Sequence, residues 1–275
     1  MVYVHGLDVI VPNWMYQQLW LPFIRRCDLI IANSSNTAKL AAERGVTADK
    51  LRILNPGTEL FQHDHTAGQV FRRRFELGGR PILLSVGRLT NRKGLAEFVA
   101  KAMPRILSAN PHALLVIVGG EASDALYTNH ASGRERIIDA ARRVGVESAL
   151  QFLGPCDDQT LNAAYQAATV HVFPVLEVLG DVEGFGMVAL EAAAHGVPTV
   201  AFNVGGISDA VQQGHTGTLV TSGDYEAFAM ATLDLLSCTP DSEYVESCRE
   251  FAASKSWPVF MQRLRQYLEE LLGGG

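Results

Sequence analysis

From residue 80 onward the sequence alternates short apolar runs with segments of helical periodicity, and this alternation constrains the fold more than any other feature. Strands are expected at residues 81–86, 113–118, 150–153, 170–174, 199–202 and 217–220, and helices at 96–107, 132–144, 158–168, 187–195 and 225–236. Continuous apolar runs are typical of strands that are buried on both faces. The order therefore predicts an α/β domain whose doubly wound parallel sheet is covered by helices on both sides.

The residues before this domain predict only part of a second α/β unit. Strands are expected at residues 2–5, 28–32 and 50–54, with an aromatic-rich stretch at 14–26 and a capped helix that starts after Asn33 and stops at Gly45. The polar stretch 62–68 is expected to be a crossing between domains. A unit of this length is too short to form a layered α/β domain by itself. We therefore expect residues 1–69 to be a partial N-terminal domain that lacks its front. Residues 70–255 form the complete domain, and 256–275 a C-terminal helix.

Composition excludes several classes of protein. A net charge of −6 argues against nucleic acid as a general partner, because binding phosphates needs a basic surface. The sequence has no uninterrupted apolar run of the length that a membrane span needs, and its first residues are strand-like rather than a signal peptide. Its four cysteines form no C-x-x-C pair, which indicates neither a zinc site nor a disulfide framework. A cytoplasmic protein is expected.

One motif after the fourth strand places two carboxylates across a glycine-bracketed turn. Glu183 and Glu191 lie eight residues apart, and Gly184 and Gly186 precede the helix that carries Glu191. Eight residues of helix would separate the carboxylates by about 12 Å, which is too wide for the paired acids of a retaining glycoside hydrolase. Glycines let the backbone lie against a ligand. The spacing therefore favours a clamp for two ends of one ligand.

Four stretches together resemble the retaining glycosyltransferases of family 4. They are the V-G-R-L-T-N-R-K-G run at 86–94, F-L-G at 152–154, F-P at 173–174 followed by Glu183–Gly186 and Glu191, and the glycine pair 205–206. The resemblance covers nearly the whole chain. It implies the GT-B plan of two facing Rossmann-like domains, and transfer of a hexosyl unit from a UDP- or GDP-sugar to a hydroxyl acceptor with retention. It implies no metal and no separate cofactor, since the nucleotide sugar is a substrate.

The resemblance also implies a role for each motif residue. Arg88 and Lys93 would stabilise the diphosphate leaving group, as cations do for phosphate oxygens. Glu183 would lie beside the donor sugar, and Glu191 would accept hydrogen bonds from the ribose. Without the family pattern, these residues would be interpreted as solvated loop cations, a helix-capping charge and a helix-surface glutamate. The backbone N–H groups of residues 184–186 would face the sugar or phosphates. The remaining donor-binding residues would be Gly87, Gly119, Leu153, Gly154, Gly184, Phe185, Gly186, Met187 and Val188.

The positions of three histidines in the sequence indicate different roles, functional for one and structural for the other two. His5 ends the first strand and matches the family histidine that points into the cleft, so it is expected to contact the transferred sugar or a phosphate. A lone histidine is otherwise more often structural. His171 lies in an apolar strand and His195 at a helix end, and both are expected to be structural. The base of the donor cannot be read from strand-end turns, because main-chain contacts carry no side-chain code.

The aromatic stretch 14–26 has two interpretations. Leu19, Phe23 and Ile24 at helical spacing predict packing in the core or between domains, whereas the terminal cations Arg25 and Arg26 fit an interfacial membrane helix. The second interpretation would place the protein peripherally at the inner membrane face. The amphipathic C-terminal segment 257–272 is expected to brace the N-terminal domain, as in relatives.

Alternative functions remain open from the sequence. A GT-B nucleotide-sugar epimerase or a glycogen-phosphorylase-like enzyme shares the architecture, and a fragment could bind nucleotide sugars without completing catalysis. A dinucleotide oxidoreductase is disfavoured because no G-x-G-x-x-G follows a strand. The acceptor, whether a lipid-linked sugar, a polysaccharide or a small molecule, depends on the N-terminal domain.

Overall fold

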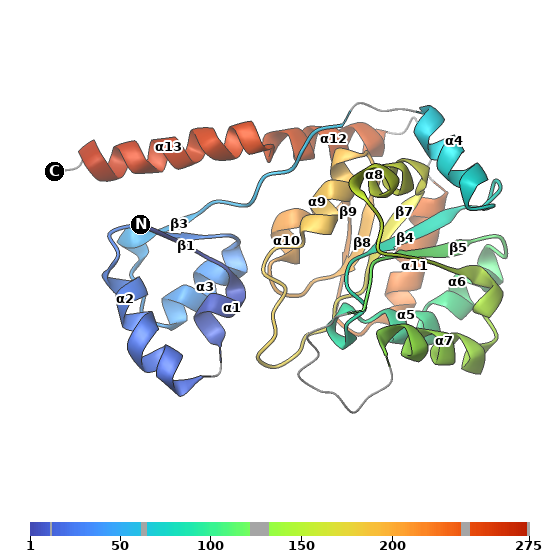
Figure 1. The fold of residues 1–275 in the computed structure, drawn as a ribbon, viewed down its shortest axis with the longest axis horizontal. Coiled ribbons are helices and arrows are strands. Elements are labelled where there is room, and N and C mark those ends of the chain that lie inside the picture. The colour runs from blue at the N-terminus through green and yellow to red at the C-terminus, as the bar shows by residue number, and fades with distance from the viewer. Residues whose placement is uncertain (12, 62–64, 122–131, 238–242, 274–275) are drawn as a thin grey trace.

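The computed structural model describes residues 1–11, 13–61, 65–121, 132–237 and 243–273. Within them the chain forms two separate sheets, one of three strands and one of six, and every strand pair in both is parallel. Figure 1 shows the small N-terminal sheet on one side of the molecule and the large sheet on the other. The predicted α/β class, with one complete doubly wound sheet and part of a second, is confirmed.

The large sheet has the strand order β6-β5-β4-β7-β8-β9. Its strands are β4 Ile82–Val86, β5 Leu114–Val118, β6 Leu150–Gly154, β7 Val170–Phe173, β8 Thr199–Phe202 and β9 Gly217–Val220. The chain builds outward from β4 to β6, then returns to β7 on the other side of β4. The topological switch point therefore lies between β4 and β7, and a ligand crevice is expected beyond the carboxyl ends of these two strands.

Helices cover both faces of this sheet, because alternate strand residues point to opposite sides. They are α4 His65–Arg74, α5 Leu95–Lys101, α6 Met103–Ala109, α7 Gly133–Val144, α8 Asp158–Ala167, α9 Met187–Ala194, α10 Ile207–Ala210, α11 Tyr225–Leu236 and α12 Glu243–Ser254. Leu83 and Leu115 pack with α5, α6, α7 and α11 on one face. Leu84 and Val116 pack with α4 and α8 on the other.

Two helix predictions need correction. The single helix expected at 96–107 is divided into α5 and α6, with Pro104 in the first turn of α6, where its missing N–H costs least. The crossing expected at 62–68 already belongs to α4 from His65 onward, while 62–64 lie outside the described residues. The close approach of Gly68 to the Gln166 carbonyl, and the hydrogen bond from Arg72 Nη2 to the Ala167 carbonyl, fix α4 to α8.

The N-terminal sheet has the order β1-β2-β3. Its strands are β1 Val2–Val4, β2 Ile30–Ala32 and β3 Leu51–Ile53, and its helical segments are α1 Gly6–Ile10, the π-helical turn η1 Tyr16–Trp20, α2 Leu21–Arg26 and α3 Ser35–Glu43. Val4 and Ile30 pack against α3 through Ala38 and Ala41. The Ser34 side chain caps α3 by accepting a hydrogen bond from the Thr37 N–H.

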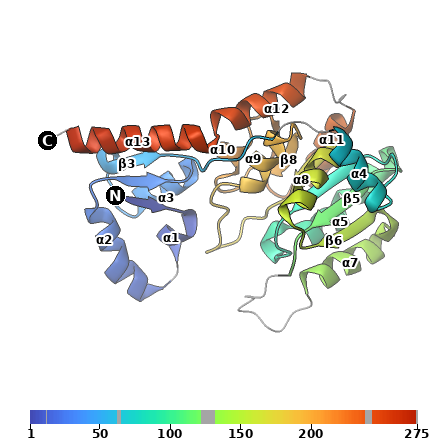
Figure 2. The ribbon, with the colours of Figure 1, turned by 45° about the horizontal axis from the view of Figure 1, so that its top comes forward.

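The C-terminal helix α13, Trp257–Gly273, leaves the large domain and lies along the N-terminal sheet, as Figures 1 and 2 both show. Phe260, Leu264 and Tyr267 pack on Leu29, Ile31 and Leu54, and the Tyr267 hydroxyl donates to the Ile53 carbonyl at 3.2 Å. The apolar stripe that the sequence indicates for this helix thus has a partner in the other domain.

The packing predicted for Leu19, Phe23 and Ile24 in the aromatic stretch 14–26 holds for Ile24, which packs against the N-terminal core, and is wrong for Leu19 and Phe23, which are exposed. Trp14, Trp20 and Phe23 are 75%, 64% and 61% exposed, and only Leu21 of η1 and α2 is buried. The π-helical turn changes the residue spacing before α2, so the aromatic positions do not form one inward face. Among the described residues no helix is both long and apolar enough to span a bilayer.

Candidate functional site

The carboxyl ends of three neighbouring strands are joined by glycines. The Gly87 N–H donates to the Val118 carbonyl at 2.9 Å, and the Gly119 N–H donates to the Gly154 carbonyl at 2.9 Å. Gly87 and Gly119 have φ angles of 136° and 139°, and a Cβ on Gly119 would overlap the Gly87 carbonyl oxygen. Only glycine permits such a close approach. The predicted strand-end residues therefore lie along one edge of the sheet.

An ion-pair cluster lies just beyond β4 and β7. Lys93 Nζ is 2.8 Å from Glu183 Oε2, and Arg92 Nη1 is 2.6 Å from the same oxygen. Arg92 Nε also lies 3.1 Å from Asp181 Oδ1. Both cations belong to the 3₁₀ turn η3 Asn91–Lys93, which Gly94 ends in a left-handed conformation before α5 begins. The structure thus joins the β4–α5 turn to the loop before α9.

The cluster is largely shielded from water. The side chains of Arg92, Lys93 and Glu183 are 15%, 17% and 14% exposed. Burial opposes the ionisation of Glu183, but Lys93 and Arg92 outweigh it and lower the pKa of the carboxyl below its usual value. Burial also lowers the pKa of Lys93, and repulsion from Arg92 and Arg88 adds to this against the attraction of Glu183. Several cations here share one buried carboxylate.

Glu191 lies on α9 beside a buried tyrosine. The Tyr165 hydroxyl is 3.0 Å from Glu191 Oε2 and 3.2 Å from the Val188 carbonyl oxygen. Burial raises the pKa of Glu191, a proximity to Asp158 adds to the rise, and the hydrogen bond from Tyr165 opposes it. Tyr165 in turn stacks on His195 with ring centroids 5.0 Å apart. The carboxylate is therefore held by a hydroxyl and lacks a cationic partner among the described residues, which suits an acceptor of neutral hydroxyl groups.

The N-terminal sheet presents His5 to the same region. His5 Nδ1 lies 3.2 Å from Asn33 Nδ2, and the Asn33 amide also lies against the backbone of Gly184. The carbonyl oxygen of Gly184 and the Oγ of Ser34 both border Gly206, where no Cβ would fit. The glycine turns of the large domain thus contact the strand ends of the small one, and Asn33 connects His5 to Gly184.

A second polar group joins the two sheets. Asp209 Oδ2, on α10, accepts hydrogen bonds from the Ser35 N–H at 2.8 Å, the Ser35 hydroxyl at 3.1 Å and Asn55 Nδ2 at 2.9 Å. Lys255 Nζ donates to Asn55 Oδ1 at 2.5 Å. These contacts hold the N-terminus of α3 against the large domain.

The structure brings most, but not all, of the predicted residues together. Arg88 is exposed and makes no ion pair within the described ranges, although it is close enough to lower the pKa of Lys93. Phe185 is only 3% exposed and packs in the core, so its backbone alone can face a ligand. The other predicted positions that are half-buried near this edge are Gly87, Gly119, Leu153, Gly154, Gly184, Met187 and Val188, whereas Gly186 is buried. His171 is buried against Thr199 Oγ1 and His195 stacks between Phe61 and Tyr165, as expected of structural residues.

Four residues at the site were not identified from the sequence: Asn33, Arg92, Tyr165 and Asp181. Arg92 lies within the motif at 86–94 and was a readable signal, because it is a second cation next to Lys93. The others carry no local pattern. Their contacts with His5, Glu191 and Arg92 depend on tertiary placement.

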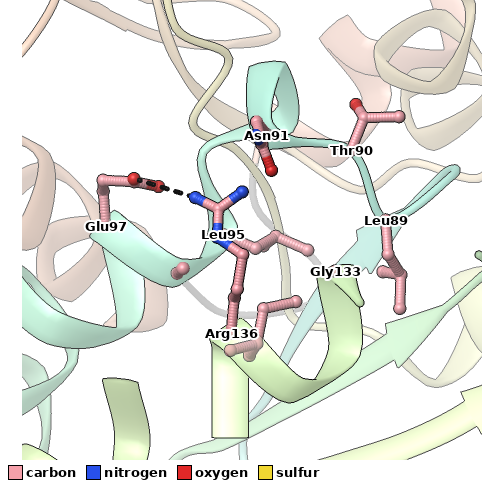
Figure 3. Close-up of a pocket in the computed structure, with 9 residues that line it drawn as sticks. Leu89, Thr90, Asn91, Leu95, Glu97, Gly133 and Arg136 are labelled. Carbon is pink, nitrogen blue, oxygen red and sulfur yellow. Dashed lines mark ion pairs between the residues drawn. The ribbon is translucent and has the colours of Figure 1, made fainter. Parts of the chain in front are cut away.

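A small cavity flanks the loop that carries Arg88 and Lys93, between α5 and the start of α7. Figure 3 shows Leu89, Thr90 and Asn91 on one side of it and the ion pair between Glu97 and Arg136, 3.6 Å long, on the other. Its volume of about 10 Å³ accommodates about one water molecule. This cavity is therefore too small for a nucleotide sugar, and none of the predicted site residues lines it.

Known proteins share sequence with this chain over most of its length. Residues 80–238 match a family model described as "Glycosyl transferases group 1". The chain is 32% identical over 219 residues to a D-inositol 3-phosphate glycosyltransferase of Nocardia farcinica, covering 78% of the chain and 46% of that protein. It is 35% identical over 241 residues to a GDP-mannose-dependent alpha-(1-6)-phosphatidylinositol monomannoside mannosyltransferase of Mycobacterium tuberculosis, covering 84% and 59%. The chain thus spans about half the length of these relatives.

Solved structures share the fold. HepE of Anabaena, in complex with UDP and glucose, superimposes with a TM-score of 0.80 at 20% identity, covering 97% of this chain and 70% of that one. Sucrose-phosphate synthase of Thermosynechococcus elongatus gives 0.78 at 28% identity, covering 99% and 68%. The predicted GT-B architecture is confirmed.

Proposed function

Because the chain belongs to the group 1 glycosyl transferase family, we propose that it binds a nucleoside-diphosphate sugar and transfers the hexosyl unit to a hydroxyl acceptor. The donor is a UDP- or GDP-sugar, transfer retains the anomeric configuration, and no metal ion takes part. One relative is named as GDP-mannose-dependent and one structural neighbour contains UDP, which supports a nucleoside diphosphate as the carrier.

One observation carries this proposal: two cations, one carboxylate and a second, hydroxyl-bound carboxylate lie around the switch point of the large sheet. Lys93 and Arg92 meet Glu183 beyond β4 and β7, and Glu191 lies on the helix that follows. The Lys93 cation suits the diphosphate, and a glutamate without a cationic partner among the described residues suits ribose hydroxyls. A ligand that consists of a sugar, phosphates and a ribose in that order would place these parts beside Glu183, Lys93 and Glu191, respectively.

The chemistry follows from the charge distribution. When the bond from the anomeric carbon to the diphosphate breaks, negative charge grows on the leaving oxygen, and Lys93 with Arg88 would stabilise it. Such preorganised stabilisation typically contributes about 10²–10³ in rate. The leaving phosphate is the base that takes the proton of the acceptor hydroxyl, so attack occurs on the face that the phosphate leaves. Glu183 and the backbone of residues 184–186 hold the sugar, with His5 on the opposite wall.

We expect the acceptor to bind at the small N-terminal domain. Trp14, Trp20 and Phe23 are exposed, and the Arg26 guanidinium lies 5.9 Å from the centroid of the Phe23 ring. Exposed aromatic rings with cations suit a membrane interface, and a relative is named for a phosphatidylinositol monomannoside. These observations support a lipid-linked acceptor and peripheral association with a membrane. Co-sedimentation with anionic phosphatidylinositol vesicles, and its loss in Trp20→Ser, would be the expected result; equal sedimentation of both proteins contradicts it.

A second candidate function is donor binding without turnover. The chain spans 46% and 59% of the two relatives, and its N-terminal sheet has three described strands against six in the large sheet. In this second candidate function the donor clamp would work as a binding module.

Incubation with radiolabelled UDP-glucose and GDP-mannose separates the two candidates. Transfer or donor hydrolysis that persists in EDTA, with the released sugar in the donor's anomeric configuration, is the expected result for the enzyme. Donor binding without either reaction supports the binding module. Loss of turnover in EDTA, restored by a divalent cation, contradicts the metal-independent mechanism.

A further inference from the structure

Glu183 is shared by two cations that do not have the same freedom. Arg92 is fixed by three contacts: its guanidinium pairs with Glu183 and Asp181, and its backbone carbonyl accepts a hydrogen bond from the Leu176 N–H at 2.8 Å. Lys93 has Glu183 as its ion-pair partner among the described residues, and its ammonium otherwise lies 4.7 Å from the centroid of the Phe173 ring. Arg92 is therefore anchored, whereas Lys93 is held by one carboxylate.

The geometry favours an exchange of partners. A guanidinium can donate to two carboxylates at once because its N–H groups fan out in one plane, whereas the flexible stem of a lysine lets its point charge turn to another anion. A nucleoside diphosphate would bring further negative charge to a buried site that already holds Glu183. Like charges in a poorly solvated place repel strongly unless each has its own cation.

We infer that Glu183 holds Lys93 in the unliganded protein and therefore competes for it with an incoming donor diphosphate, and that Arg92 is the positioning residue that retains Glu183 when Lys93 turns to the phosphates. The inference rests on the proposed function, because it takes the diphosphate of a nucleotide sugar as the incoming anion. It adds a role for Arg92, which the motif residues alone do not provide.

The consequence is unusual for a residue at a donor site: removing the charge of Glu183 strengthens diphosphate binding. In Glu183→Gln, Lys93 no longer has to leave a carboxylate, so UDP and GDP are expected to bind about tenfold more tightly, or about 1.4 kcal/mol. Transfer still falls, because Glu183 also faces the sugar. In Arg92→Gln the released Glu183 has no cation, so the same nucleotides bind about tenfold more weakly, and Arg92→Lys restores part of the loss.

A double-mutant cycle distinguishes this role from direct phosphate binding by Arg92. UDP and GDP are titrated calorimetrically into the wild type, Glu183→Gln, Arg92→Gln and the double variant. Once Glu183 is neutral, Arg92 still pairs with Asp181 but no longer has the charge of Glu183 to retain, so Arg92→Gln is expected to change the affinity by less than about threefold in that background. Arg73→Gln, on the exposed side of α4, is the charge-matched control.

Two results would overturn the inference while leaving nucleotide binding intact: Glu183→Gln binds no tighter than the wild type, or Arg92→Gln loses the same factor in both backgrounds. Failure of the wild type to bind either nucleotide would overturn both the inference and the proposed function. Circular dichroism and the midpoint of thermal unfolding confirm that each variant is folded before it is titrated.

Discussion

The hydroxyl of Tyr165 lies 3.0 Å from Glu191 Oε2, and Tyr165 itself is only 1% exposed. A tyrosine of α8 thereby fixes the orientation of the carboxylate proposed to receive the ribose. In the proposed donor site, Tyr165 would therefore be a positioning residue that no ligand atom needs to touch.

Replacing Tyr165 by Phe tests this relationship. The variant removes the hydroxyl that opposes the rise in the pKa of Glu191, so that pKa rises further and the carboxylate is less firmly placed. Binding of UDP or GDP is expected to weaken about three- to tenfold, as for loss of a hydrogen bond worth about 1 kcal/mol. Calorimetric titration measures the change, and Tyr225→Phe on α11 is the control. Unchanged affinity in Tyr165→Phe would show that Glu191 needs no positioning.

Gly94 ends the turn that carries Arg92 and Lys93. Its φ of +67° is unfavourable for other residues, and a Cβ there would overlap the Pro174 carbonyl oxygen. Gly78 has a similar φ of +59° but open space around its Cα. Gly94→Ala is expected to lower the free energy of unfolding by about 3 kcal/mol or more, and Gly78→Ala by about 1 kcal/mol, because only the first adds a steric clash to the backbone strain. Urea denaturation compares them, and equal losses would contradict the close packing at Pro174.

The buried His171 predicts a pH dependence of stability. Burial, and to a smaller extent Lys93, lowers its pKa from 6.5 to about 3. Between these values the unfolded chain binds a proton that the folded chain does not, so this contribution to stability is present above pH 6.5 and is lost as the pH falls toward 3. The loss is at most about 1.4 kcal/mol per pH unit. Urea denaturation from pH 7 to pH 4 should show a shallower fall in His171→Asn, and parallel curves would contradict the prediction.

Asp209 connects α10 to Ser35 and Asn55 of the small domain. Asp209→Ala leaves these donors without their acceptor, so the free energy of unfolding is expected to fall by about 1–3 kcal/mol. The two sheets should also separate, which small-angle X-ray scattering detects as a larger radius of gyration. Asp139→Ala, an exposed position on α7, is the control. A radius unchanged in Asp209→Ala would show that α13 and the contacts at Gly184 and Gly206 hold the domains together without Asp209.

The strand and helix order of the large domain was predictable because each strand is an uninterrupted apolar run and several helices carry local start and stop signals. Ser132 and Glu135 form a capping box at the start of α7, and Gly145 ends that helix with a φ of +71°. The aromatic stretch was not predictable in the same way. A π-helical turn at Tyr16–Trp20 rotates the side chains before it relative to those of α2, and no local residue pattern indicates such a turn.

In the candidate site, too, local motifs were predictable from the sequence and tertiary contacts were not. Glycines at strand ends and charged residues in fixed motifs could be located from the sequence, and Glu183 with Lys93 do meet. The partner of Lys93 was not predictable, because Lys93 and Glu183 are ninety residues apart and the sequence indicated a phosphate rather than a carboxylate. The role of Tyr165 was also not predictable, since a buried tyrosine on an amphipathic helix usually indicates only core packing.

The central claim is that Glu191 holds the ribose of a nucleoside diphosphate whose phosphates face Lys93. Calorimetric titration of UDP and GDP into the wild type and Glu191→Ala, with Glu269→Ala on α13 as the control, tests it most directly. We expect saturable binding of at least one nucleotide to the wild type and the control, and a loss of about 100-fold or more in Glu191→Ala, equivalent to two hydrogen bonds to a charged group. Equal affinity of Glu191→Ala and the wild type, or no binding of either nucleotide to the wild type, would contradict it.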